Sequence, residues 1–113
     1  MEQSTPIINH FVALIRLAGV DDWGNLASNL AESLIQKLNL TVIKSDSHNF
    51  SPHGETRVYL LSQSHLAIHT WPEDGVMHVD LVTCSEANLG QFEEGVRPDF
   101  LREKIIDLQA RKV

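Results

Sequence analysis

Hydroxyl, imidazole and amide side chains crowd into one short segment, Ser62-Gln63-Ser64-His65-Leu66-Ala67-Ile68-His69, and the chain's single cysteine, Cys84, ends a later apolar run. A serine hydroxyl can attack the peptide carbonyl that precedes it, giving an ester that eliminates to dehydroalanine and hydrolyses to a pyruvoyl group. Such chemistry needs an activated serine, a nearby proton shuttle and a strained or polarised peptide. Histidine suits the shuttle because its unperturbed pKa is about 6.5.

A carbonyl made in this way would serve a particular kind of reaction. Removal of carbon dioxide from an α-amino acid leaves a carbanion, for which no ordinary side chain is an electron sink. Pyridoxal phosphate can fill that need, but no lysine motif in the chain indicates that cofactor. A thiol, with an ordinary pKa of about 8.5, is a sensible acid toward such a carbon.

The elements that position these residues are mostly strands. Alternating and β-branched apolar residues predict strands at 10–20, 40–45, 57–62, 65–71 and 76–84. Loops are predicted at 47–56, which contains Pro52 and Gly54, and over the polar stretch 85–96.

Two helices complete the prediction. Asp21-Asp22 is a good helix start, and apolar residues recur at three- and four-residue steps from Trp23 to Leu38. Pro98 suits the first turn of a second helix that would continue to about Ala110. We therefore expect one α+β domain over residues 1–113, a two-layer α/β sandwich with an antiparallel sheet of about four strands packed against two helices.

The sequence Pro72-Glu73-Asp74-Gly75 is a strong hairpin signal between two of these strands. If Glu73 and Asp74 form a two-residue loop, the numbers of opposing residues sum to 147. His69 then faces His78, and Ala67 faces Asp80. Strict alternation places Ser64 and His69 on opposite faces of the sheet, so their meeting requires a turn or bulge near Ser64.

Charge, apolar runs, the number of cysteine residues and the spacing of histidine residues exclude several classes of function. The net charge of −6 argues against nucleic-acid binding, which depends on Lys and Arg. No apolar run approaches the roughly 20 residues that span a bilayer, so no membrane association and a cytoplasmic location are expected. One cysteine rules out an internal disulfide. His65 and His69 would lie roughly 13 Å apart along a strand, so no metal site is expected.

Three separated motifs together resemble one family, the bacterial and archaeal S-adenosylmethionine decarboxylase proenzymes. The stretch from Ser62 to Glu73 resembles that family's Ser-Glu-Ser-His-x-x-Ile-His-Thr-Trp-Pro-Glu pattern. Val79-Asp80-Leu81-Val82-Thr83-Cys84 matches its strand ending in Thr-Cys, and His48-Asn49-Phe50-Ser51-Pro52-His53-Gly54 is similar to its His-x-Phe-x-Pro-x-Gly loop. A weaker match extends from His10 to Arg111.

The resemblance implies a role for each residue of the site. Ser64 is the precursor of a pyruvoyl cofactor, and the bond from Gln63 to Ser64 is cut, giving a β fragment 1–63 and an α fragment 64–113. His69 moves a proton during self-processing, and Cys84 reprotonates the substrate carbon. Processing is supported by Gln63 and by Thr56, while substrate contacts are assigned to Phe50, which stacks on adenine, and Glu73, which binds the ribose.

Four residues depart from the family pattern. Gln63 replaces a usual Glu, Asp74 a usual aromatic, His78 a small residue and Ser85 a common Gly. The resemblance implies S-adenosylmethionine as substrate, polyamine synthesis as the context and a homodimer of cleaved protomers. Two alternatives stay open: the same chemistry on arginine or ornithine, and an uncleaved homologue that regulates an active partner.

Overall fold

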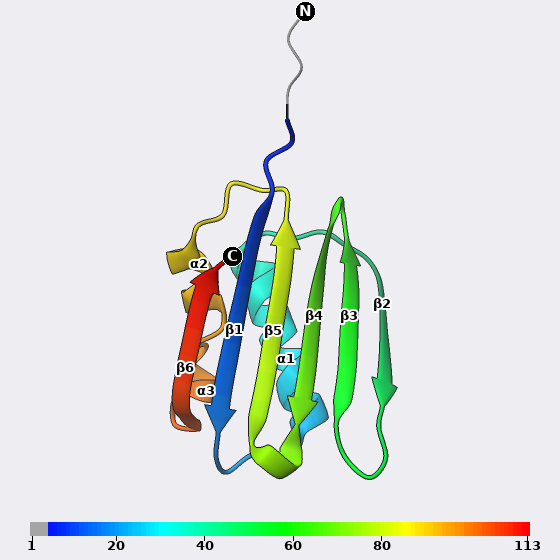
Figure 1. Cartoon of the computed structure of the whole chain (residues 1–113), viewed down its shortest axis with the longest axis vertical. Coiled ribbons are helices and arrows are strands. Elements are labelled where there is room, and N and C mark those ends of the chain that lie inside the picture. Colours follow the sequence, from blue (N-terminus) through cyan, green and yellow to red (C-terminus); the bar gives the residue numbers. More distant parts are fainter. Residues whose placement is uncertain (1–4) are drawn as a thin grey trace, which may run out of the picture.

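The computed structural model describes residues 5–113, which form one antiparallel sheet with helices on one side of it (Figure 1). The strands are β1 (Asn9–Leu17), β2 (Val42–Asn49), β3 (Glu55–Leu61), β4 (Ser64–Trp71), β5 (Val76–Thr83) and β6 (Ile105–Lys112). The helices are α1 (Trp23–Lys37), α2 (Leu89–Gly95) and α3 (Asp99–Arg102), and a 3-10 turn, η1, spans Pro72–Asp74. Within the described residues, no helix is long and apolar enough to cross a membrane.

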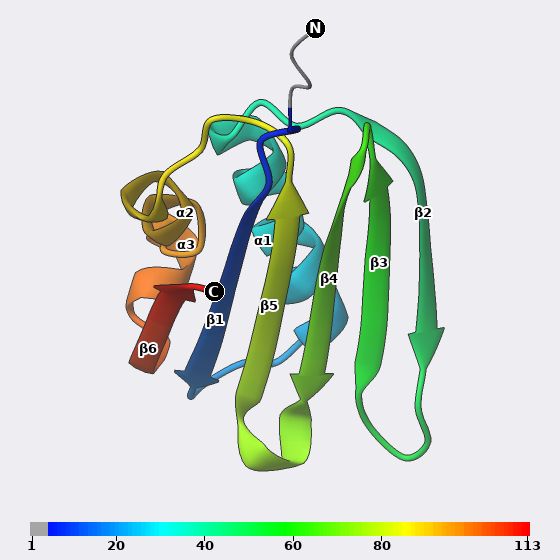
Figure 2. The ribbon, with the colours of Figure 1, turned by 45° about the horizontal axis from the view of Figure 1, so that its top comes forward.

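The sheet has the strand order β2-β3-β4-β5-β1-β6. Figure 2 shows α1, α2 and α3 together behind this sheet, with no element in front of it. We call the uncovered side the open face. Its side chains are those at alternate strand positions, among them Val12, Leu14, Ala67, His69 and Asp80.

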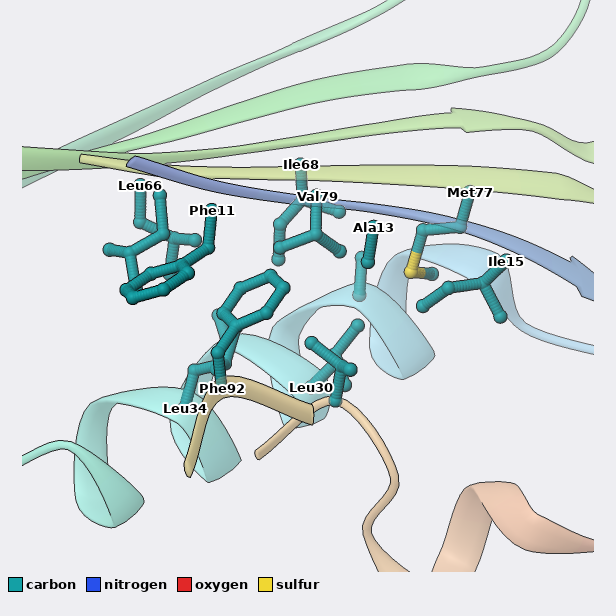
Figure 3. Close-up of a cluster of buried hydrophobic side chains, with 14 of the residues drawn as sticks. Phe11, Ala13, Ile15, Leu30, Leu34, Leu66, Ile68, Met77, Val79 and Phe92 are labelled. Atoms are coloured by element: carbon teal, nitrogen blue, oxygen red, sulfur yellow. The ribbon is translucent and has the colours of Figure 1, made fainter. Parts of the chain in front are cut away.

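The other side of the sheet carries the hydrophobic core. Phe11, Ala13 and Ile15 alternate with half-buried or exposed residues along β1, as expected for a strand with one buried face. In Figure 3 their side chains point at Leu30 of α1 and Phe92 of α2. The rings of Phe11 and Phe92 stack with centroids 5.3 Å apart. This packing fixes α1 and α2 on the sheet.

Several expectations about the elements are confirmed. The chain is an α+β fold, and α1 begins where predicted because the side chain of Asp22 accepts a hydrogen bond of 3.0 Å from the backbone N–H of Asn25. The residue numbers of β4 and β5 do sum to 147, with His69 opposite His78 and Ala67 opposite Asp80. The turn itself is longer than predicted, because Trp71 already pairs with Val76 and four residues lie between them.

The expected helix from Pro98 to Ala110 is wrong, and so is the count of four strands and two helices. Only the four residues of α3 are helical, and the chain then becomes β6, which pairs with β1 from Leu17 to Phe11. Leu108 and Ala110 pack against the core from this strand. Their spacing fits a helix as well as a strand, and the free hydrogen-bonding edge of β1 decides between the two.

The predicted loop 85–96 contains helix α2. The side chain of Asn88 accepts from the backbone N–H of Gln91, and the Gln91 side chain accepts from the Asn88 N–H, a capping box. Gly95 indicates close packing here and not a loop: a Cβ at this position would lie 2.6 Å from Leu34 Cδ2. The edge strand β2 also continues to Asn49, beyond the predicted end at Ser45, and its side chains are exposed throughout.

Candidate active site

Ser64 and Cys84 meet at one end of the sheet. Ser64 is the first residue of β4, and Cys84 follows the last residue of β5. The backbone N–H of Cys84 donates to Ser64 Oγ at 3.0 Å, and the Ser64 hydroxyl donates to Cys84 Sγ at 3.6 Å. Cys84 Sγ also lies 3.7 Å from the carbonyl oxygen of Ser62 and 3.8 Å from Gln63 Oε1. The thiol therefore lies beside the two residues that precede Ser64.

The peptide before Ser64 belongs to a tight turn. Leu61 pairs with Ser64, so Ser62 and Gln63 alone connect β3 to β4. Gln63 has φ 58°, in the left-handed region that costs a residue with a side chain about 1–2 kcal/mol. Both turn residues are exposed. A strained, accessible peptide thus directly precedes the serine hydroxyl.

A second cluster lies toward the other end of β4. Thr56 of β3 pairs with His69 of β4, and Thr56 Oγ1 is hydrogen-bonded to His69 Nδ1 at 2.9 Å. The His69 ring lies 6.1 Å from the Trp71 ring and 6.4 Å from the His78 ring, centroid to centroid. The hydroxyl fixes one ring nitrogen of His69 and leaves the other for a further partner.

A cavity of about 300 Å³ opens beside this second cluster. Its lining includes Phe50, Gly54, Thr56, His69 and Trp71. Phe50 is 52% exposed, and its ring makes a T-shaped contact with the His48 ring at 4.7 Å between centroids. Glu73 lies in η1, exposed and outside this lining.

The two clusters stay apart within one chain. The β4 ladder runs without a register shift from Ser64 to Trp71, so the bulge that would bring Ser64 to His69 does not form. Five residues of strand separate them by about 17 Å. Ser64 pairs with Leu61 and His69 with Thr56, residues of opposite side-chain direction along β3. The structure therefore contains two half-sites, Ser64 with Cys84 and Thr56 with His69.

Comparison with known proteins identifies the family of the chain. A family model described as S-adenosylmethionine decarboxylase matches residues 22–108. The chain belongs to the S-adenosylmethionine decarboxylase family. A curated relative from Archaeoglobus fulgidus, named S-adenosylmethionine decarboxylase proenzyme, is 33% identical over 70% of this chain and 75% of its own length.

Other members of the S-adenosylmethionine decarboxylase family agree. A proenzyme of the same name from Aquifex aeolicus is 49% identical over 50% of this chain and 42% of its own length, and one from a Hydrogenobaculum strain is 45% identical over 70% and 63%. The alignments with these two span less than two thirds of the relatives. A crystal structure titled adenosylmethionine decarboxylase from Aquifex aeolicus superposes with a TM-score of 0.69 at 28% identity, over 97% of this chain and 91% of that one.

Some residues of this family member's site carry no signal in the sequence. Asn9, 8% exposed, donates from Nδ2 to the carbonyl oxygen of Ser85 at 2.7 Å, and Ser85 is also held by the Thr83 hydroxyl at 2.9 Å. These contacts fix the turn that aims the Cys84 N–H at Ser64. An asparagine at a strand start has no pattern that would predict a partner 76 residues away.

Proposed function

We propose that this protein is a self-processing S-adenosylmethionine decarboxylase that cuts its own chain before Ser64, turns that serine into a pyruvoyl group and removes carbon dioxide from S-adenosylmethionine. The observation that carries the proposal is the pair of contacts from Ser64 Oγ to the N–H and Sγ of Cys84. The strained turn at Gln63 supports it, as do the names of the relatives.

The residues present fit the formation of the group. Ser64 Oγ attacks the carbonyl carbon of Gln63, the bond from that carbon to the Ser64 nitrogen breaks, and the hydroxyl proton passes to the nitrogen. Elimination then removes the Cα proton of residue 64 and releases Gln63 as a carboxylate. Hydrolysis with loss of ammonia leaves the pyruvoyl group on fragment 64–113. His69, oriented by Thr56, is the group we assign to the Cα proton.

After cutting, the same side chains serve the substrate. The pyruvoyl group supplies an electron sink for decarboxylation. Cys84, beside residue 64, donates the proton that replaces carbon dioxide. Phe50 offers its exposed ring to the adenine, and Glu73 is assigned to the ribose hydroxyls. These roles make fragments 1–63 and 64–113 parts of one catalyst.

We further propose that two copies pair through the open face, because one chain cannot bring its half-sites together. A twofold axis lying across the strands near Ala67 turns each protomer end for end. The Ser64 end of one copy then lies opposite the His69 end of its partner. Sheets packed face to face lie about 10 Å apart. Because Ser64 follows the helix-side alternation of β4, His69 of the other copy would reach it at the end of the sheet, past the exposed turn of Ser62 and Gln63.

The open face has the apolar surface that such pairing needs. Leu14, Leu60 and Trp71 on this side are 40%, 50% and 42% exposed, and Val12 and Val58 on the same face are half-buried. An uncovered sheet face that exposes large apolar side chains is a candidate interaction site. A second copy would cover them.

Intact-mass analysis of the purified chain tests self-processing. We expect two fragments that divide after Gln63, and a Ser64→Ala variant should remain a single chain of 12.7 kDa without activity. An uncut wild-type chain would instead favour the regulatory homologue. Carbon dioxide release should occur with S-adenosylmethionine; release from arginine or ornithine alone would reassign the substrate.

Co-expression of two inactive variants tests the shared site. Ser64→Ala and His69→Ala chains are each expected to stay uncut alone. In a mixed dimer, the His69→Ala chain keeps Ser64 and meets the intact His69 of the other copy, so this chain alone should be cut. Absence of any cutting in the mixture, with mixed dimers present, would place both half-sites in one protomer.

A further inference from the structure

Histidines are gathered on the open face. Five of the six in the chain lie at alternate strand positions whose side chains point away from the helices: His10, His48, His65, His69 and His78. The sixth, His53, lies in the loop between β2 and β3. Register places them in two rows across the sheet. His10 and His65 flank Val82 in one row, and His48, Thr56, His69 and His78 follow one another in the other.

The remaining charges of the open face balance one another. The strand positions of this face hold three carboxylates and three cations. The carboxylates are Asp46, Asp80 and Asp107, and the cations are Lys44, Arg16 and Arg111. With neutral imidazoles the face therefore carries no net charge, and each protonated histidine adds one positive charge. A twofold pairing would double that number across the interface.

The surroundings of His78 are unfavourable for a positive charge. Burial lowers its pKa, and Asp80 raises it in part, while His69 and Arg111 lower it further. His69 of β4 lies directly opposite it, Leu14 of β1 lies on its other side, and Arg111 comes from β6. His10 has a different neighbour, because its Nε2 lies 2.6 Å from Asp80 Oδ1.

We propose that pairing of two copies through the open face is linked to loss of protons from its histidines, so that acid separates the protomers. The inference rests on the dimer of the proposed function. Covering the face removes the water that solvates His69 and His78, and brings the second copy's imidazoles toward them. Charged imidazoles then cost more in the dimer than in the monomer.

The number of protons released on association sets how strongly the dissociation constant of the dimer depends on pH. Each proton that must leave on association raises the dissociation constant about tenfold for every pH unit below the pKa of its group. The two His78 side chains of a dimer alone give up to about a hundredfold per pH unit. Replacing His78 should remove that share, whereas replacing His53 should remove none.

Sedimentation of the wild-type protein at about pH 8 and about pH 5.5 tests the inference, since histidines titrate between these values. We expect dimers at the higher pH and a dissociation constant raised about tenfold or more at the lower one, with circular dichroism unchanged. His78→Gln, which keeps a polar side chain that does not titrate, should flatten this dependence, and His78→Ala provides a second such variant. His53→Ala should behave as the wild type.

The possible results distinguish a failure of the proton linkage from a failure of the proposed dimer. A dimer whose dissociation constant is the same at both pH values would overturn the proton linkage alone. Monomers at both pH values would overturn the dimer, and with it the shared site. Equal pH dependence in the wild type and in both His78 variants would overturn the role of His78.

Discussion

The backbone N–H of Cys84, and not only its thiol, contacts the hydroxyl of Ser64, at 3.0 Å. A main-chain donor survives substitution of the side chain, so this relationship divides the proposed work of residue 84 into two parts. The N–H orients the attacking serine, and the thiol supplies a proton afterwards. The two parts can be separated by mutation.

Cys84→Ala should therefore still be cut but should not turn over substrate. The N–H that holds Ser64 Oγ remains, while the proton donor is lost, and removal of a general acid typically costs about 100-fold or more in rate. Intact mass measures cutting, and carbon dioxide release measures turnover. An uncut Cys84→Ala chain would mean that the thiol is needed in processing as well.

Thr56→Val should slow self-cutting about tenfold, the cost of one lost hydrogen bond of about 1.4 kcal/mol. Valine keeps the shape of threonine but cannot hold His69 Nδ1, which Thr56 Oγ1 contacts at 2.9 Å. Thr56→Ser keeps the hydroxyl and serves as the matched control. Time courses of cutting after synthesis give the rates, and equal rates in Thr56→Val and the wild type would remove Thr56 from processing.

Stability should fall as the pH drops through the ordinary titration range of histidine, near 6.5, because of His78. Its pKa is lowered in the folded protein, chiefly by burial, so the unfolded chain binds its proton first. Stability from this group is therefore fully present above the unfolded pKa and declines below it. Urea unfolding at about pH 7.5 and about pH 5.5 measures this, at one protein concentration because pairing adds to stability.

His78→Gln should lose less stability than the wild type over the same pH interval. The comparison isolates one group, since the other histidines remain. An identical loss in both proteins would assign the acid sensitivity to other groups.

Gly95→Ala should destabilise the fold by about 1–3 kcal/mol, because overpacking a core forces neighbours to move. The added Cβ would lie 2.6 Å from Leu34 Cδ2, between α1 and α2. Gly24→Ala in α1 is the control, since the nearest atom to its Cβ, Asp22 Oδ1, is 3.7 Å away. Equal unfolding midpoints in urea for the two variants would contradict this packing.

Local patterns predicted much of the centre of the sheet. The hairpin residues around Pro72 and Gly75 and the alternation in β4 and β5 were enough to place His69 opposite His78. The prediction for the segment after Pro98 was wrong because its apolar spacing fits a helix as well as a strand. The choice between them depends on pairing with β1, some 90 residues earlier in the chain. No local pattern contains that information.

The candidate site was also only partly predictable from the sequence. Motifs singled out Ser64, Thr56, His69 and Cys84, but the sequence could not say which of them meet. Contacts across 20 residues, such as Cys84 to Ser64, depend on how the strand ends align. Ser64 and His69 lie about 17 Å apart along β4 because the ladder has no bulge between them, and the sequence alone did not show whether a bulge forms.

The strand order has a consequence for the protein after a cut before Ser64. Fragment 1–63 contributes β1, which lies between β5 and β6 of fragment 64–113, while β3 stays paired with β4. The two pieces are interleaved in one sheet, and neither keeps a complete core without the other. The cut thus turns a single chain into an obligate two-chain assembly, in which release of either piece amounts to unfolding and refolding becomes a bimolecular event.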